Sequence, residues 1–438
     1  MFKTAFYERE ITPPLGCDLP GYFNVRPGSD VKDRLMAKAC VISDGTETIA
    51  LIALDSCGIA NKIRNEIAKR VSDYTGIPES NVCVGAIHTH TGIPAYGFNK
   101  DEEAKKNQEG YFDIFPKIIA DCAILAYKRL EESELTYALG NVEGISFCRD
   151  YEMKNSTPRT NPGRLNPDIV GPMSETDNEL PVLFIRDPKG NPKGAIITFA
   201  CHLDCVDGTE YSGDFPAETS KQLKKLYGED FVTVFFMGTA GDINHFNVNT
   251  AGDSPDHYRK MGQKVAGEMV RSLAFAEPVE DSGVKCRYEI LNIDRTQVSE
   301  ERIAWAKHNI ATIKEVKGIK IAADNTAQDQ YDLGMSKSLM RFVENNPEVF
   351  EVPLQFIQIG DVKFFIFPSE IFCYFGLDLK ERSGAKKRFV TTYCNGGYGY
   401  VPTREMFYDT IYESKPGANK LNAEAGYIMV DKLLEMSK

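Results

Sequence analysis

The fold is organised around the stretch Val84-Gly85-Ala86-Ile87-His88-Thr89-His90-Thr91-Gly92. An apolar run ends at His88, and a second histidine follows two residues later, in a chain with six histidines in total. Side chains two residues apart on an extended segment point to the same side, and imidazoles bind metal ions or polarise a carbonyl group. Two surface histidines in a loop would explain the same pattern, so the rest of the chain has to decide between these interpretations.

The composition excludes several classes of protein. Of the 438 residues, 42% are hydrophobic and 26% charged, as is ordinary for a soluble globular protein with a sizeable core. The formal net charge of −12, without a long basic run, argues against nucleic acid and anionic membranes as partners. No apolar run approaches the ~20 residues of a transmembrane helix. Because the N-terminus lacks a signal-peptide pattern, we expect a cytoplasmic protein, or a secreted or periplasmic one if a leader has been removed.

The cysteine pattern favours reduced thiols. Eleven cysteines are scattered along the chain without a Cys-x-x-Cys pair, and several lie in apolar runs. Such cysteines behave as small buried hydrophobes in a reducing compartment. Cys201 and Cys205 flank His202, so a thiolate metal ligand at this place stays an alternative.

The hydrophobic pattern around the histidine pair predicts a β–α–β arrangement. Strands are expected at 36–43, 48–54 and 82–87. A helix at 60–75 would connect the last two, and Asp55 either faces a site or caps that helix. Further strands are expected at 135–140, 180–185, 194–200, 231–237, 283–295, 353–360, 362–367 and 388–393, and further helices at 112–132, 216–227, 255–274 and 420–436. We therefore predict an α/β fold, with a mixed β-sheet core flanked by helices and the site at the C-terminal ends of strands.

Two segments interrupt this pattern. Residues 151–178 are rich in Asn, Pro and Ser, which predicts a long ordered loop or lid. Residues at about 299–346 are charged and mostly helical in pattern, which predicts a helical insertion at the surface.

Several of the predicted strands end in chemically useful residues, which are His88 and His90, His202, Asp242 and Asn244, Glu370, and Tyr398 and Tyr400. Each has a structural explanation when taken alone, since a carboxylate is favoured at a helix start and a lone histidine is usually a core residue. Their recurrence at strand ends indicates one common site. Two histidines and a carboxylate with an open position form a familiar catalytic zinc set.

Eight segments of the chain form an ordered pattern: Ile11–Gly16, Gly21-Tyr22, His88–Gly92, Thr198–His202, Ser212–Asp214, Gly241-Asp242, Phe367–Glu370 and Tyr400–Thr403. In this pattern the chain resembles the neutral/alkaline (non-lysosomal) ceramidase family over nearly its whole length, and in particular the family's N-terminal catalytic domain. The resemblance implies four zinc ligands, which are His88, His202, Glu370 and Tyr400. Residues implied at the scissile amide are His90 and Arg149, and those expected to contact the substrate are Asp242 and Tyr412.

The chain departs from the family pattern in two places. Asn244 stands where the family's Gly-Asp-x-Ser-Pro-Asn loop carries a serine that is regarded as catalytic. The chain also ends before the C-terminal immunoglobulin-like domain that such ceramidases carry, so we expect residues 1–438 to form a single catalytic domain.

These features together predict a zinc-dependent hydrolase of an amide bond, a ceramidase-like N-acyl amidohydrolase. A zinc-bound water with a pKa lowered towards ~7 can act as nucleophile without a serine. Asn244 and His90 would then hydrogen-bond the developing oxyanion, which is often worth ~3–4 kcal/mol in the barrier, and Arg149 would anchor the substrate. The implied partner is a small-molecule or lipid-like N-acyl substrate, as in sphingolipid metabolism, and the oligomeric state is not indicated.

Other functions stay open. The substrate can be an ester, a lactone or a small N-acyl compound in place of a lipid amide. A metal-dependent amidohydrolase barrel would need further histidines at strand ends, whereas His257 and His308 fall in predicted helices. A non-catalytic ligand-binding relative would explain the missing serine, although all four candidate ligands are retained.

Overall fold

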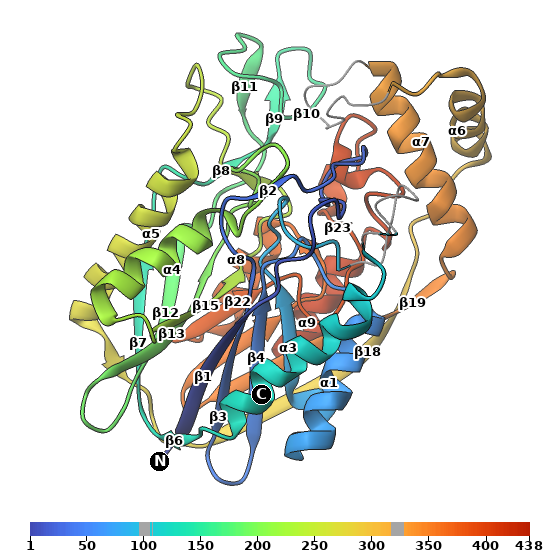
Figure 1. The fold of residues 1–438 in the computed structure, drawn as a ribbon. Helices are drawn as coiled ribbons and strands as arrows, with labels where there is room; N and C mark the ends of the chain where they lie inside the picture. The colour runs from blue at the N-terminus through green and yellow to red at the C-terminus, as the bar shows by residue number, and fades with distance from the viewer. Residues whose placement is uncertain (96–105, 107, 317–327) are drawn as a thin grey trace.

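The computed structural model describes residues 1–95, 106, 108–316 and 328–438. Its described part is a mixed α/β fold built on three main β-sheets with helices packed around them, which confirms the predicted fold class (Figure 1). None of the described helices is long and apolar enough to cross a bilayer.

The first sheet has the strand order β5-β4-β3-β1-β6. The hairpin of β3 (Met36–Ser43) and β4 (Thr48–Leu54) is antiparallel. Helix α1 (Asn61–Thr75) then returns the chain to β5 (Val82–Ala86), which is parallel to β4. The edge is completed by β1 (Lys3–Glu10) and β6 (Glu131–Glu132).

The second sheet repeats this arrangement in the order β15-β13-β12-β7-β17. The antiparallel pair β12 (Glu179–Arg186) and β13 (Pro192–Phe199) is followed by α4 (Asp214–Tyr227). The chain then enters β15 (Val232–Met237), parallel to β13. On the other side lie β7 (Glu134–Asn141) and β17 (Glu277–Pro278).

The third sheet, β18-β19-β20-β22, contains the same unit again. β18 (Val284–Asp294), β19 (Val349–Ile359) and β20 (Val362–Ile366) are antiparallel neighbours. Helix α8 (Cys373–Ser383), which was not predicted, leads to β22 (Arg388–Thr391), parallel to β20. Because the two strands of a parallel pair end at the same edge, each unit brings the ends of two strands together.

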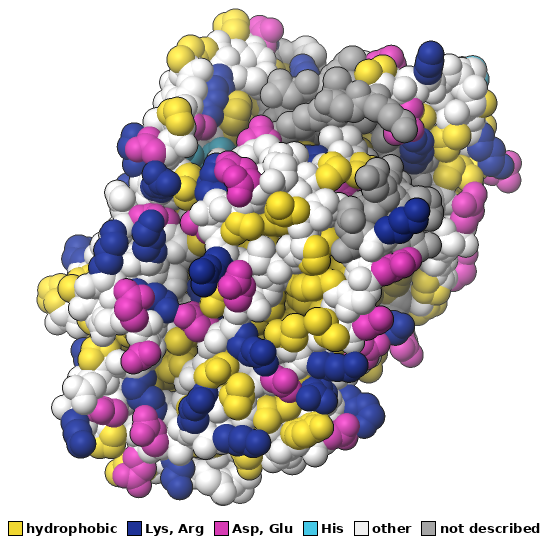
Figure 2. Space-filling model, in the orientation of Figure 1, with side chains coloured by type: hydrophobic (Ala, Val, Ile, Leu, Met, Phe, Trp, Pro, Cys, Tyr) yellow, Lys and Arg dark blue, Asp and Glu magenta, His cyan; other side chains and the backbone are white. Residues whose placement is uncertain are grey.

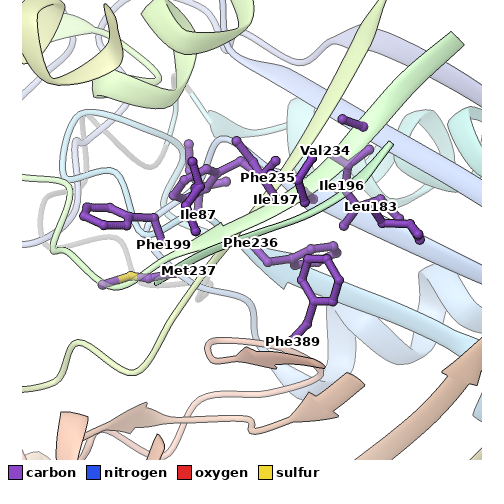
Figure 3. Close-up of a cluster of buried hydrophobic side chains, with 14 of the residues drawn as sticks. Ile87, Leu183, Ile196, Ile197, Phe199, Val234, Phe235, Phe236, Met237 and Phe389 are labelled. Carbon is purple, nitrogen blue, oxygen red and sulfur yellow. The ribbon is translucent and has the colours of Figure 1, made fainter. Parts of the chain in front are cut away.

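A large hydrophobic cluster joins the three sheets. Figure 3 shows part of it, with Phe235 and Phe236 of β15 on opposite sides of their strand and Phe389 of β22 on the Phe236 side. Helices α1 and α3 (Tyr111–Tyr127) cover the outer face of the first sheet with a second cluster. Helices α8 and α9 (Ala425–Met436) cover the third sheet.

The first of the two segments that interrupt the pattern is more structured than the predicted loop, and the second contains helices, as predicted. Residues 151–178 contain most of a small three-stranded sheet, formed by β9 (Asp150–Met153), β10 (Arg159–Thr160) and β11 (Ile169–Pro172). The segment at 299–346 contains α6 (Glu300–Thr312) and α7 (Gln328–Asn345), while residues 317–327 lie outside the described residues.

The remaining elements are short, except for α5 (His257–Ser272), which packs beside α4. They are β2 (Asp30–Val31), β8 (Phe147–Cys148), β14 (Glu210–Tyr211), β16 (Ile243–Asn244), β21 (Glu370–Ile371), β23 (Tyr400–Val401) and the 3-10 helices η1 (Glu79–Asn81), η2 (Leu273–Phe275), η3 (Arg404–Met406) and η4 (Tyr412–Ser414). All eleven cysteines are free thiols and all except Cys205 and Cys286 are buried, as expected. On the face drawn in Figure 2, basic and acidic side chains are interspersed.

Candidate metal centre

His88 follows β5 and turns its imidazole towards the common edge of the sheets. Its φ of 71° is in the left-handed region, which costs a non-glycine residue about 1–2 kcal/mol. The turn is held by its backbone N–H, which donates to Ser56 at 2.9 Å. His88 Nδ1 lies 2.5 Å from the carbonyl oxygen of Cys57. An Nδ1–H that donates to a carbonyl leaves Nε2 with a lone pair for a metal ion.

His202 follows β13 and is oriented in the same way. Its Nδ1 lies 2.7 Å from the carbonyl oxygen of Ala240 and 3.0 Å from that of Ile243. Its backbone N–H also donates to Ile243, at 3.2 Å. The loop after β15 therefore orients this imidazole and leaves its Nε2 available.

Glu370 lies just beyond β20 and meets both histidines. Its Oε2 is 3.7 Å from Nε2 of His88 and 3.6 Å from Nε2 of His202. The three ligand atoms lie within 4.8 Å of one another. Glu370 Oε2 is buried and has no hydrogen-bond partner among the described residues. Such a carboxylate oxygen, facing two imidazole nitrogens, fits a cation at the centre of the group.

The protonation states of this group also fit a metal ion. Burial lowers the pKa of His88 to about 3, so its imidazole is neutral near pH 7. Burial by itself would raise the pKa of Glu370, but the neighbouring His88 and His202 lower it, to about 2. Metal ions bind neutral imidazoles and ionised carboxylates. His88 and Glu370 are therefore in the protonation states that a divalent cation requires.

Tyr400 lies beside Glu370, because β21 and β23 are parallel and these two residues are partners in register. Its ring stacks with that of His202 at a centroid distance of 6.3 Å. Burial and the charge of Glu370 raise the pKa of the Tyr400 phenol well above its usual range. Tyr400 is thus near the candidate ligands, and its role as a fourth ligand stays a prediction.

His90 lies between the three candidate ligands and the surrounding cavities. Its Nε2 is 3.2 Å from Nε2 of His88, and its Nδ1 is 3.6 Å from Oδ1 of Asp204. Tyr22 packs edge-on against the His90 ring and donates a hydrogen bond to Asp204. Neither Asp204 nor the contact of Tyr22 was predicted, because both come from loops without a strand-end pattern.

Arg149 places a positive charge beside the candidate ligand His202. Its Nη1 lies 3.5 Å from His202 Nε2, and its guanidinium carbon lies 5.0 Å from the ring centroid of Tyr400. Nη2 donates to the carbonyl of Gly241 at 2.7 Å and is paired with the buried carboxylate of Glu413. Burial lowers and Glu413 raises the pKa of Arg149, with a net rise, so the guanidinium stays charged.

Asn244 and Asp242 have different surroundings although they are two residues apart. Asn244 borders a cavity, and its Nδ2 donates to Asn161 Oδ1 at 3.0 Å. Asp242 is fully buried, where Oδ1 accepts from the Cys373 N–H at 2.7 Å and Oδ2 accepts from Ser174 at 2.6 Å. Both carboxylate oxygens of Asp242 are thus hydrogen-bonded inside the protein, so the expected contact of Asp242 with the substrate is wrong.

Two cavities meet at this site. The larger has a volume of about 540 Å³ and is bordered by His88, Glu370 and residues of α7. The smaller, of about 200 Å³, is bordered by Arg149, His202 and Asn244. Tyr412, His90 and Tyr400 border both cavities. The structure therefore brings together all predicted site residues except Asp242.

Other possible ligands differ in their surroundings. His245, Asp253 and His257 form a second group of potential ligands, but Arg164 is already paired with Asp253. His257 and His308 lie in α5 and α6, as predicted. The thiol of Cys201 faces the carbonyls of Ile145 and His202, each at 3.6 Å, so the thiolate alternative has no support in this geometry.

The fold and the site together define a mixed α/β protein with a buried candidate metal centre where parallel strands end. The sequence matches the family described as "Neutral/alkaline non-lysosomal ceramidase, N-terminal" over residues 9–252, which is more than half of the chain. The chain belongs to this family.

Relatives of known name agree with this assignment. Neutral ceramidase B of Dictyostelium discoideum is 26% identical over 248 residues, which are 52% of this chain and 33% of that protein. Neutral ceramidase A of the same organism is 23% identical over 253 residues, covering 53% of this chain and 33% of that protein. The chain thus spans about a third of the length of the curated relatives it matches.

Solved structures show the same fold. The crystal structure of neutral ceramidase from Pseudomonas aeruginosa matches with a TM-score of 0.73 at 19% identity, over 100% of this chain and 74% of that chain. A ceramidase complexed with C2 matches with a TM-score of 0.74 at 17% identity and with the same coverage. At these identities the likeness concerns the fold alone.

Proposed function

We propose that this protein is a zinc-dependent hydrolase of amide bonds. The observation that carries the proposal is the convergence of His88 Nε2, His202 Nε2 and Glu370 Oε2 on one buried point. Membership of the ceramidase family supports amide chemistry. Zinc is the metal of choice, because a His₂Glu set leaves positions open for a further ligand and the substrate.

Tyr400 would be the fourth protein ligand, since it lies opposite Glu370 in the parallel pair. Bound by these residues, zinc would supply a Lewis acid that polarises the amide carbonyl and lowers the pKa of a water towards ~7. A serine nucleophile is then not required, which is consistent with Asn244 at the family's serine position.

The chain's own side chains would bind and orient the amide. One N–H of Asn244 donates to Asn161, and its second N–H is available for the substrate carbonyl. His90 borders both cavities and can hydrogen-bond the substrate beside the ligands. Arg149 would stabilise negative charge that develops near His202, as preorganised cations do in water-poor sites. Tyr412 would contact the substrate from the wall shared by the cavities.

We also propose that residues 1–438 fold as one catalytic domain. The proposal is supported by the hydrophobic cluster that the three sheets share. The likeness to the Pseudomonas aeruginosa structure, which extends over the whole chain, supports it as well. Helices α6 and α7 would be an insertion within this domain.

Metal analysis tests the proposal. Zinc content and turnover of N-acyl substrates are measured for the wild type, His88→Ala and His202→Ala, with His308→Ala as a control on the exposed side of α6. We expect about one zinc per chain in the wild type and the control, and loss of zinc and turnover in both ligand variants. Unchanged zinc and turnover in the ligand variants would overturn the proposal. Esters and lactones in the same substrate panel separate an amidase from an esterase, and zinc without any hydrolysis indicates a ligand-binding relative.

A further inference from the structure

The larger cavity has two basic side chains on its wall, in addition to the residues of the candidate metal centre. Helix α7 contributes Ser338, Arg341 and Asn345 to its wall, and the segment after β23 contributes Lys420. In Figure 1, α7 lies beside the C-terminal part of the chain that carries β23. The cavity volume of about 540 Å³ is in the range of small-molecule sites. Two cations therefore share one ligand-sized cavity with the candidate metal centre.

Neither cation forms an ion pair within the described ranges. Arg341 Nε donates only to the carbonyl of Lys337, one turn earlier in the helix, at 3.3 Å. Lys337 itself points elsewhere and pairs with Glu315 at 2.8 Å. Among the described residues, the carboxylates on the cavity wall are Asp18, which accepts the Arg26 N–H at 2.7 Å, and Glu370, which faces the two histidines.

Among the residues that the structure describes, neither Arg341 nor Lys420 has a carboxylate paired with it. Arg341 is an exposed residue on the cavity wall, and the partial burial of its guanidinium lowers its pKa. Burial also lowers the pKa of Lys420. The negative charge of Glu370 raises this pKa, but by less than burial lowers it. Holding a cation in a partly dehydrated cavity is unfavourable unless an anion is nearby. An anionic group on a ligand would offset this cost, because charge-assisted hydrogen bonds to Arg and Lys are short and strong.

We propose that Arg341 and Lys420 form an anion subsite, so that the amide substrate of this protein carries a carboxylate or a similar oxyanion. The substrate class rests on the proposed amide hydrolysis, whereas the subsite concerns binding alone. N-acyl amino acids are the simplest compounds of this class. Their amide would lie at the metal centre and their carboxylate at Arg341 and Lys420. An uncharged lipid amide would offer neither cation an anionic partner.

The test uses the zinc-loaded protein and three amides with the same acyl chain: an N-acylglycine, an N-acyltaurine and an N-acylethanolamine. They are similar in length and end in a carboxylate, a sulfonate and a neutral hydroxyl. Hydrolysis is measured as kcat/KM. Binding is measured as Kd with non-hydrolysable isosteres, in which a CH₂ group replaces the amide N–H. We expect the wild type to bind the anionic isosteres at least about tenfold more tightly than the neutral one.

Two variants test whether Arg341 and Lys420 cause the preference for anionic isosteres. Arg341→Gln and Lys420→Gln should each reduce the anionic-to-neutral ratio of Kd about tenfold. Lys337→Gln, on the same helix but paired with Glu315, should keep the wild-type ratio. Zinc content and thermal unfolding are measured for each variant, so that a folding defect is recognised. The Kd values of the carboxylate and sulfonate isosteres show which oxyanion the protein prefers.

Two outcomes would overturn the subsite. One is equal affinity of the wild type for the anionic and neutral isosteres. The other is an unchanged ratio in both folded glutamine variants. A ratio that falls as expected, in a protein that hydrolyses none of the three amides, supports the subsite and contradicts the proposed amide hydrolysis instead.

Discussion

The guanidinium of Arg149 is paired with the carboxylate of Glu413, and both groups are buried beside the candidate metal centre. Glu413 is held in turn by the hydroxyl of Thr160, which donates to its Oε2 at 3.0 Å. The oxygen of the same hydroxyl lies 2.7 Å from Oδ1 of Asp150, which is the alternative acceptor of its single proton. The position of Arg149 against His202 therefore depends on residues from two distant segments.

Glu413→Gln should destabilise the protein by about 3–5 kcal/mol, because it leaves the Arg149 charge buried without its partner. The free energy of unfolding is measured by urea denaturation. The control is Glu424→Gln, which breaks an exposed pair with Arg404 and should cost less than about 1 kcal/mol. Equal, small effects of both substitutions would show that the buried pair is not needed for stability.

Removal of the metal should lower the melting temperature. A ligand that binds only the folded state stabilises it by about 2.7 kcal/mol at a hundred times its Kd. Calorimetry of wild-type protein before and after chelation, and again after addition of zinc, should show a reversible decrease. Glu370→Gln weakens one of the three ligands, so its melting temperature should respond less to zinc. If the melting temperature of the wild type changes neither on chelation nor on addition of zinc, the proposed metal centre is wrong.

Asn244→Ala should reduce kcat about 10²-fold or more if the Asn244 amide stabilises the oxyanion. KM should change less, because this interaction strengthens in the transition state. Asn249→Ala, in the exposed part of the same loop, is the matched control. If kcat is unchanged in Asn244→Ala, a different group stabilises the oxyanion.

Asp55 should make stability depend on pH. Its Oδ2 accepts from the Met36 N–H at 2.9 Å, and α1 has no side-chain cap, so Asp55 neither faces the cavities nor caps the helix. Burial raises its pKa from 3.8 to about 6, although Lys38 and the Met36 N–H oppose the rise. The folded state thus holds the proton more tightly than the unfolded state. The contribution of Asp55 is fully present below about pH 4 and is lost as the pH rises through about 6, by about 3 kcal/mol.

Asp55→Asn should remove this contribution, since the amide oxygen can still accept from Met36. Unfolding of metal-free wild type and Asp55→Asn is measured between pH 4 and 8. Use of metal-free protein excludes proton competition at the metal ligands. We expect the stability of the variant, relative to wild type, to increase between about pH 4 and 6 and to stay constant at higher pH. A constant difference would show that Asp55 is ionised throughout.

Much of the local structure could be predicted from the sequence. The strands β3, β4 and β5 and helix α1 end within one residue of the expected positions, because their hydrophobic periods and turn residues are local signals. Helix α8 was missed, since its apolar residues gather in its first half and its charged residues in its second half, without a clear helical period. The threefold use of a hairpin, a helix and a parallel strand was also missed, because the three units share topology but no evident sequence repeat.

The sequence by itself determined which residues stand at strand ends, and hence the candidates His88, His202 and Glu370. Only the tertiary structure decided that their ligand atoms converge, because backbone pairing, such as that of Thr89 with Leu203, joins segments more than a hundred residues apart. It also decided that Asp242 holds the α8 start and that Glu413 supports Arg149. Arg341 and Lys420 likewise acquire a shared cavity only when α7 packs against the C-terminal segment. The physical reason is that side-chain chemistry is local, whereas burial, pairing of charges and cavity walls depend on which distant segments pack together.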